Sequence, residues 1–186
     1  VNATLTNSGS GTMTTGVATL GTAAKTLSFT NSSTGELVIG AITATGTGTA
    51  GSALTSFGFT NTGVNGAANT IAALNLNSGG SIGTYTYTDS ASAQANTIAA
   101  ITAGTISAMT ITASADSAGS HTWATLANVG SIGNISVTTA DTVAFTTGAT
   151  AATSIGNITA AMSGTSAVVN LGTMGASGTM GDITVT

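Results

Sequence analysis

Three aspartates are the first residues of this sequence to consider for chemistry. Asp89, Asp116 and Asp141 each stand in the polar stretch that follows a strand-like segment. Carboxylates stacked on neighbouring strands bind Ca²⁺ or serve as the acid and base of a glycosidase. Their distances from the last Thr of the preceding segment differ (one, four and three residues), so they align poorly. We therefore expect turn aspartates that bond to local backbone groups.

His121 and Trp123 are the other chemically distinctive side chains. A lone His in a chain without Cys gives no metal-ligand spacing, so we expect His121 to be an exposed turn residue. Trp123 begins an apolar stretch, which favours a place in the core or at its rim over stacking on a sugar. We accordingly expect no catalytic residues, no cofactor and no metal, and we do not expect an enzyme.

The most regular candidate set is a series of Thr-x-Thr pairs. Alternate residues of a strand lie roughly 6.6–7 Å apart and neighbouring strands about 4.8 Å apart, so such pairs would form a flat grid of hydroxyl and methyl groups. The grid resembles the face of β-solenoid ice-binding proteins. The simpler interpretation is that Thr, being β-branched, suits a solvated strand face. Gly58 and Ala161 interrupt the ladder, whose members are Thr4, Thr6, Thr30, Thr60, Thr86, Thr88, Thr110, Thr112, Thr138, Thr159, Thr184 and Thr186.

These pairs belong to a repeat of about 25 residues that runs the whole length of the chain. Each copy contains a four-residue segment with apolar residues in its first and third places and small polar residues between them, which is the period of a strand. In six of the eight copies a further apolar residue stands three positions before the first place. The segments begin near residues 3, 27, 57, 85, 109, 135, 158 and 183.

A second apolar stretch follows about half a repeat later, beyond a polar turn of variable length. Two or three short strands per repeat, joined by turns of Gly, Asn and Ser, describe one coil of a parallel β-solenoid. The absence of Pro agrees, since every coil must donate backbone hydrogen bonds to its neighbour. We predict an all-β chain: a single parallel β-solenoid domain over residues 1–186 with about seven coils, right-handed by default.

The register makes specific predictions about the interior. Tyr85 and Tyr87 occupy inward places, so both should be buried with bonded hydroxyl groups. Asn134, Asn157 and Asp182 recur in a separate column, which we interpret as a ladder of side-chain amides. The third place of each segment predicts one buried column that comprises Phe29, Phe59, Tyr87, Ile111, Val137 and Val185.

Composition excludes several functions. One Lys and no Arg against five acids cannot neutralise a run of phosphates, so we expect no nucleic-acid partner. No apolar run approaches the roughly 20 residues of a membrane span, and we expect no membrane insertion. Without Cys there is no disulfide framework. The chain opens at Val1 rather than Met, which suggests a processed or excised chain.

The Gly/Thr/Ser/Asn/Ala-rich, Cys-free repeats resemble those of secreted bacterial or archaeal β-helical surface proteins, such as adhesin stalks and surface-layer components. The resemblance implies an extracellular or cell-surface protein with a structural or adhesive role. Both ends of the sequence are ladder strands without a helix, Pro or charge cluster to block pairing. We therefore predict self-association, or cover by flanking chain, with ice binding as the alternative and a glycan-binding adhesin module third.

Overall fold

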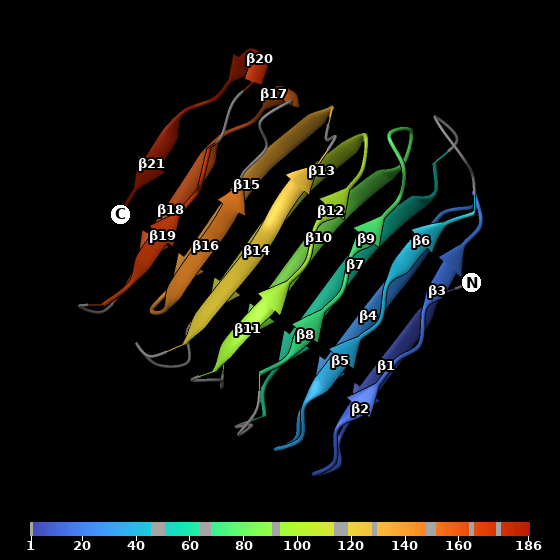
Figure 1. The fold of residues 1–186 in the computed structure, drawn as a ribbon. Coiled ribbons are helices and arrows are strands. Elements are labelled where there is room, and N and C mark those ends of the chain that lie inside the picture. The colour runs from blue at the N-terminus through green and yellow to red at the C-terminus, as the bar shows by residue number, and fades with distance from the viewer. Residues whose placement is uncertain are drawn as a thin grey trace.

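The protein is an all-β parallel β-solenoid of about six turns, with no helix among the residues that the structure describes. The computed structural model describes residues 2–45, 51–63, 68–90, 94–113, 119–127, 130–147, 152–163, 166–173 and 176–186. Successive coils lie side by side in two facing layers, and the two termini lie at opposite ends of the stack (Figure 1). Within the described ranges, no helix has the length and apolarity needed to cross a membrane.

The first layer is a ten-stranded parallel sheet that carries the four-residue segments of the repeat. In its last two coils the strand divides in two, at Gly156-Asn157 and at Gly181-Asp182. The strands are β1 (Ala3–Asn7), β4 (Lys25–Asn31), β7 (Ala53–Asn61), β10 (Ser81–Asp89), β13 (Thr105–Ala113), β15 (Ser131–Thr139), β17 (Ala152–Ile155), β18 (Ile158–Met162), β20 (Ala176–Met180) and β21 (Ile183–Val185).

The second layer is an eleven-stranded sheet built from the second apolar stretch of each repeat. Most coils contribute two short strands, which merge into one continuous strand in β14. The strands are β2 (Met13–Thr14), β3 (Ala18–Leu20), β5 (Leu37–Ile39), β6 (Ile42–Ala44), β8 (Thr70–Ile71), β9 (Leu74–Asn75), β11 (Ala95–Ile98), β12 (Ile101–Thr102), β14 (Ser120–Ala127), β16 (Thr142–Thr147) and β19 (Val168–Asn170).

The strand register confirms the predicted inward column over most of its length. The third-place residues from Phe29 to Val137 are direct neighbours on successive strands and are buried. Val185 was predicted to be buried with them, and this is wrong, because its side chain is 59% exposed. It pairs with Ala160 on β18, but among the described residues no further strand covers it.

Aromatic rings fill the middle of the core. All seven Phe, Tyr and Trp residues of the chain are buried. Phe57 stacks on Tyr85 with ring centroids 5.1 Å apart, and Phe59 stacks on Tyr87 at 5.0 Å. Trp123 reaches across from the second layer and meets Tyr87 edge-on at 5.0 Å. Such pairs add about 0.5–1.5 kcal/mol each beyond the area that they bury, so these coils hold the two layers together.

The predicted amide ladder is present at the C-terminal coils. Asn134 Oδ1 accepts a hydrogen bond from the backbone N–H of Asn157 at 3.0 Å, and Asn157 Oδ1 accepts one from Asp182 at 3.1 Å. Gly156 has to be glycine here, since a Cβ at this position would lie 2.6 Å from Asn134 Oδ1. The ladder therefore holds the backbone where the strand divides.

Introducing a charge into the inward column tests the fold. We expect Ile111→Asp to lower the free energy of unfolding by about 4 kcal/mol or more, because Ile111 is fully buried and an unpaired carboxylate there is costly. Thr112→Asp, on the outward side of the same strand, is the control and should cost less than about 1 kcal/mol. Urea unfolding followed by Trp123 fluorescence measures both. Equal losses would contradict the register.

Candidate functional site

The threonine ladder lies on the outer face of the first sheet. Thr30, Thr60, Thr88, Thr112 and Thr138 are direct neighbours on five successive strands. Their side chains alternate with buried neighbours and are half-buried or exposed, as the period of two requires. This column presents five consecutive hydroxyl and methyl groups about 4.8 Å apart.

The remaining members form the second column and the ends of the ladder. Gly58 interrupts the second column between Ser28 and Thr86, and Ala161 continues the first column beyond Thr138 without a hydroxyl group. Thr159 lies between Ser136 and Thr184. The structure places the other predicted members on the same outer side, namely Thr4 and Thr6 on β1, Thr86 on β10, Thr110 on β13, and Thr184 with Thr186 at the C-terminal edge.

A further threonine column, which we did not predict, lies on the outer face of the second sheet. Thr70, Thr97 and Thr122 are neighbours on β8, β11 and β14. Each precedes a buried apolar residue, so the Thr-apolar dipeptide in successive repeats was the available signal. Both outer faces therefore carry hydroxyl columns, and the first sheet has the longer one.

The structure also contains a polar site that sequence reasoning missed. Seven side chains that the sequence places in polar turns, or for which it predicts no role, are buried at one corner between the two sheets. We call them the buried polar cluster. Its members are Asn31, Asn61, Asn69, Asp89, Asn96, His121 and Asp141.

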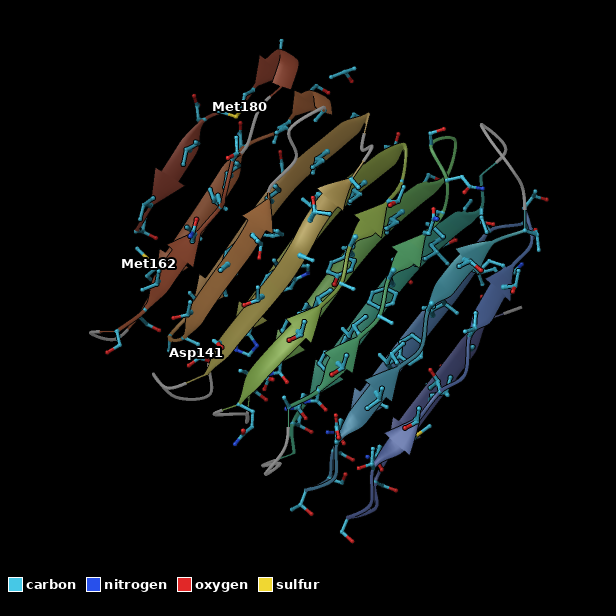
Figure 2. The ribbon with its side chains drawn as sticks, viewed as in Figure 1. Asp141, Met162 and Met180 are labelled. Carbon is cyan, nitrogen blue, oxygen red and sulfur yellow. The ribbon has the colours of Figure 1, made fainter. Side chains whose placement is uncertain are left out.

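The expectations for three of these residues were wrong. His121 is not exposed but fully buried on β14. Asp89 is the last residue of β10, and Asp141 lies between β15 and β16 (Figure 2); both carboxylates are fully buried. For Asp89 the reason is that the strand continues for a fifth place, which faces inward like the first and third. His121 occupies an inward place of β14, two residues before the buried Trp123. Asp116, the third predicted turn aspartate, lies outside the described residues.

Hydrogen bonds connect the cluster from coil to coil. Asn31 Nδ2 donates to Asn69 Oδ1 at 3.1 Å, and Asn96 Oδ1 accepts from the backbone N–H of Asn69 at 2.7 Å. Asp89 accepts from Asn61 Nδ2 at 3.0 Å through Oδ1 and from Asn96 Nδ2 at 2.8 Å through Oδ2. A buried carboxylate with two amide donors is well solvated by the protein, which offsets part of its desolvation cost.

His121 joins the cluster to the aromatic core. Its Nε2 lies 3.3 Å from Asp141 Oδ2, and its Nδ1 lies 2.9 Å from the Tyr87 hydroxyl oxygen and 3.3 Å from Asn96 Nδ2. Because Asn96 Nδ2 can only donate, His121 Nδ1 is the acceptor and Nε2–H donates to Asp141. The imidazole of His121 therefore accepts at Nδ1 and donates from Nε2.

The surroundings of Tyr85 and Tyr87 raise the pKa of both hydroxyl groups. Burial raises the pKa of Tyr85, an effect that the hydrogen bond from Trp123 Nε1 to its hydroxyl oxygen (3.1 Å) partly offsets. Burial also raises the pKa of Tyr87 well above its usual range, and Asp89, Tyr85 and Asp141 raise it further by charge repulsion. Both predictions for the tyrosines, burial and bonded hydroxyl groups, are confirmed.

The cluster and the surface ladder offer different chemistry. The side chains of the cluster are fully or almost fully buried, so a substrate in solution does not touch them in this conformation. Among the described residues, no three of His, Asp and Glu come together as metal ligands. What the cluster does is pair buried polar groups across five coils, which rigidifies the corner.

The C-terminal coil carries the third feature, an exposed apolar edge. Ile183 is 52% exposed and Val185 59% exposed, although their register partners on β18 are buried. Met162 and Met180 lie on the last coils at the same end of the stack (Figure 2) and are also exposed. Exposed apolar side chains in one group ordinarily mark an interaction site.

No known family model, curated protein or solved structure matches this chain. The features of the molecule that bear on its function are the threonine ladder, the buried polar cluster and the exposed apolar edge.

The buried tyrosines give a direct spectroscopic test of the cluster. In the folded chain, tyrosinate absorbance near 295 nm should not appear as the pH rises past about 10, where exposed tyrosines ionise. The unfolded chain should titrate normally there. Because the folded state keeps protons that the unfolded state loses, the free energy of unfolding should fall as pH rises above about 10. Titration of both tyrosines near pH 10 without loss of structure would contradict the burial.

Proposed function

We propose that this protein is a structural β-solenoid that assembles with further copies of itself through its end coils, in a filament or layer outside the cell or at its surface. The observation that supports this most strongly is the apolar edge at Ile183 and Val185. In the interior coils the same two places are buried by the next strand. A strand from another molecule that paired with β21 would bury Ile183 and Val185 in the same way.

The backbone at this end supports the same proposal. β21 pairs with β18 on one side, and among the described residues its other side faces no strand. An open edge offers unpaired N–H and C=O groups, and proteins that stay monomeric usually block such edges with charge, Pro or a bulge. Asp182 is the one charged residue near β21, so little repulsion opposes pairing.

Three details of composition are in line with the proposed location outside the cell. The chain has no Cys to be oxidised and very few charged residues, and its repeats consist of small side chains that pack closely. The parallel strands keep their register along the stack, as a structural rod requires, apart from shifts at Lys25/Thr26 and at Ala152/Ser154. A stack of this kind gains stability with each added coil.

The self-association proposal predicts concentration-dependent assembly. In sedimentation velocity between about 1 and 100 µM, the mass should exceed that of a 17.5 kDa monomer. Val185→Lys should restore the monomer, because it places a charge in the apolar contact. Thr184→Lys, on the outward side of the same strand, is the matched control and should leave assembly unchanged. A wild-type chain that stays monomeric throughout would refute the proposal.

The outer face of the first sheet supports a second candidate, which is binding to ice. The observation in its favour is the uninterrupted column from Thr30 to Thr138, with five threonines on five neighbouring strands. Their regular spacing places hydroxyl and methyl groups on a nearly periodic lattice. This is a property of the surface alone and does not depend on the end coils.

A substitution in the middle of the face tests the ice-binding candidate. Thr112→Tyr should abolish thermal hysteresis, because the bulky ring prevents the flat face from meeting a crystal surface. Thr97→Tyr on the other sheet is the control and should retain hysteresis. Circular dichroism shows whether both variants keep the fold. If the unmodified protein at millimolar concentration shows neither hysteresis nor crystal shaping, this candidate is excluded.

A further inference from the structure

The chain contains the motif Asn-x-Ser/Thr at four asparagines, which are Asn2, Asn31, Asn134 and Asn157. In exported proteins this motif is the acceptor for N-linked glycosylation, which joins a sugar to the side-chain amide nitrogen Nδ2. Because the chain is rich in Ser and Thr, the motif recurs through composition alone, and the structure is needed to separate the four. It divides them into two kinds.

Three of the four asparagines occupy one column on the outer side of the first sheet, each just before the first place of its segment. All three side chains are exposed. Asn2 Oδ1 accepts a hydrogen bond from the backbone N–H of Thr26 in the next coil at 3.0 Å. Asn134 and Asn157 do the same for Asn157 and Asp182. Among the described residues, no group bonds to the Nδ2 of these three asparagines.

This arrangement leaves free the atom that the modification uses. Oδ1 is directed along the stack to the next coil, so Nδ2 on the same carbon points away from that bond. N-glycosylation forms a bond from Nδ2 to the anomeric carbon of a sugar, breaks the bond from that carbon to a lipid diphosphate, and releases one proton from Nδ2. Oδ1 is unchanged, so a glycan at this place does not remove the hydrogen bond that holds the next coil.

The neighbours of Asn134 are equally compatible with a glycan. Alternate residues of a strand point to the same side, so the hydroxyl group that the motif requires, on Ser136, lies on the outer face with Asn134, and it is exposed. Thr159 stands in the same relation to Asn157 and is also exposed. Ala108, the partner of Asn134 on β13, has only a methyl side chain. No large side chain on β13 therefore covers the amide of Asn134 at this place.

Asn31 is the opposite case. It is fully buried, and its Nδ2 donates to the carbonyl oxygen of Gly35 at 2.9 Å and to Asn69 Oδ1 at 3.1 Å. A sugar on this nitrogen would displace at least one of the two bonds and would need space inside the packed corner. The folded chain therefore cannot carry a glycan at Asn31, which makes this motif an internal negative control.

We propose that Asn2, Asn134 and Asn157 are acceptors for N-linked oligosaccharide and that Asn31 is not; the inference rests on the proposed location outside the cell, since the motif is used in exported proteins. Asn134 and Asn157 lie one strand spacing apart, about 4.8 Å, so a sugar on one crowds the other. We therefore expect one glycan at this pair in each molecule. The sugars lie on the outer side of the sheet and leave the end coils free for contacts between copies.

Cleavage at Met with cyanogen bromide separates the sites. Residues 1–13 contain Asn2, residues 14–109 contain Asn31, and residues 110–162 contain both Asn134 and Asn157. In the chain purified from the cells that produce it, mass spectrometry should find saccharide in the first and third of these fragments. That saccharide should resist mild alkali, as N-linked sugar does and sugar on Ser or Thr does not. Alkali-resistant saccharide on the fragment with Asn31 would overturn the inference.

Substitutions identify the atom that carries the sugar in fragment 110–162. Asn134→Gln and Asn157→Gln together should remove it, whereas either change alone should leave one glycan on the other site. Ser136→Ala combined with Asn157→Gln should also remove it. This variant keeps Asn134 and its Oδ1 bond and takes only a hydroxyl group from an exposed place, so it is the matched control for damage to the fold. Saccharide that persists in the double Gln variant would place the sugar elsewhere and refute the proposal.

Failure of this inference differs from failure of the proposed function. If the protein is recovered outside the cell or at its surface, and no alkali-resistant saccharide is found on fragments 1–13 and 110–162, the inference fails while the proposed function stands. If the protein is recovered from the cytoplasm, without saccharide and as a monomer in sedimentation, both fail.

Discussion

The structure depends on one constraint, which is that each coil must place its strands in register above those of the coil before it. Every interior strand of the first sheet donates to and accepts from a neighbour on each side. In-register stacking puts side chains of the same repeat position in contact, so each column must consist of residues that pack on one another. The columns of Ile, Leu, Val and aromatic residues satisfy this condition inside, and the columns of Thr and Ser satisfy it outside.

The same constraint explains why so many polar groups can be buried. A column of Asn, Asp and His at one corner brings donors and acceptors of successive coils within hydrogen-bond distance. Tyr87 and His121 connect that corner to the aromatic stack, so the polar and apolar parts of the core share side chains. Buried polar networks of this kind favour one register over others, because a shift by one residue would leave their members unpaired.

The outer faces and the end coil follow from the same geometry. The side chains of an outward column do not have to be buried by a neighbouring strand. They can therefore contact a surface outside the molecule, which is what the ice-binding candidate requires of the threonine column. An inward column does need a neighbour on each side, and among the described residues Ile183 and Val185 have one only on the β18 side. Function in such a molecule is thus expected on the faces and at the ends, while the buried polar cluster stabilises the rod between them.

The sequence by itself determined the strand segments, their parallel stacking and which places face inward. The segments and their inward places follow from alternation within four residues, which is local, and the parallel stacking follows from the repeat of about 25 residues. It also determined the amide column at Asn134 and Asn157, because those residues align without a gap. Only the tertiary structure decided that His121, Asp89 and Asp141 are buried together. They come from different sheets and are joined by turns of variable length, so no spacing along the chain predicts their contact. The exposure of Val185 was likewise decided by the tertiary structure, since burial in a stack depends on the coil that follows rather than on the residue itself.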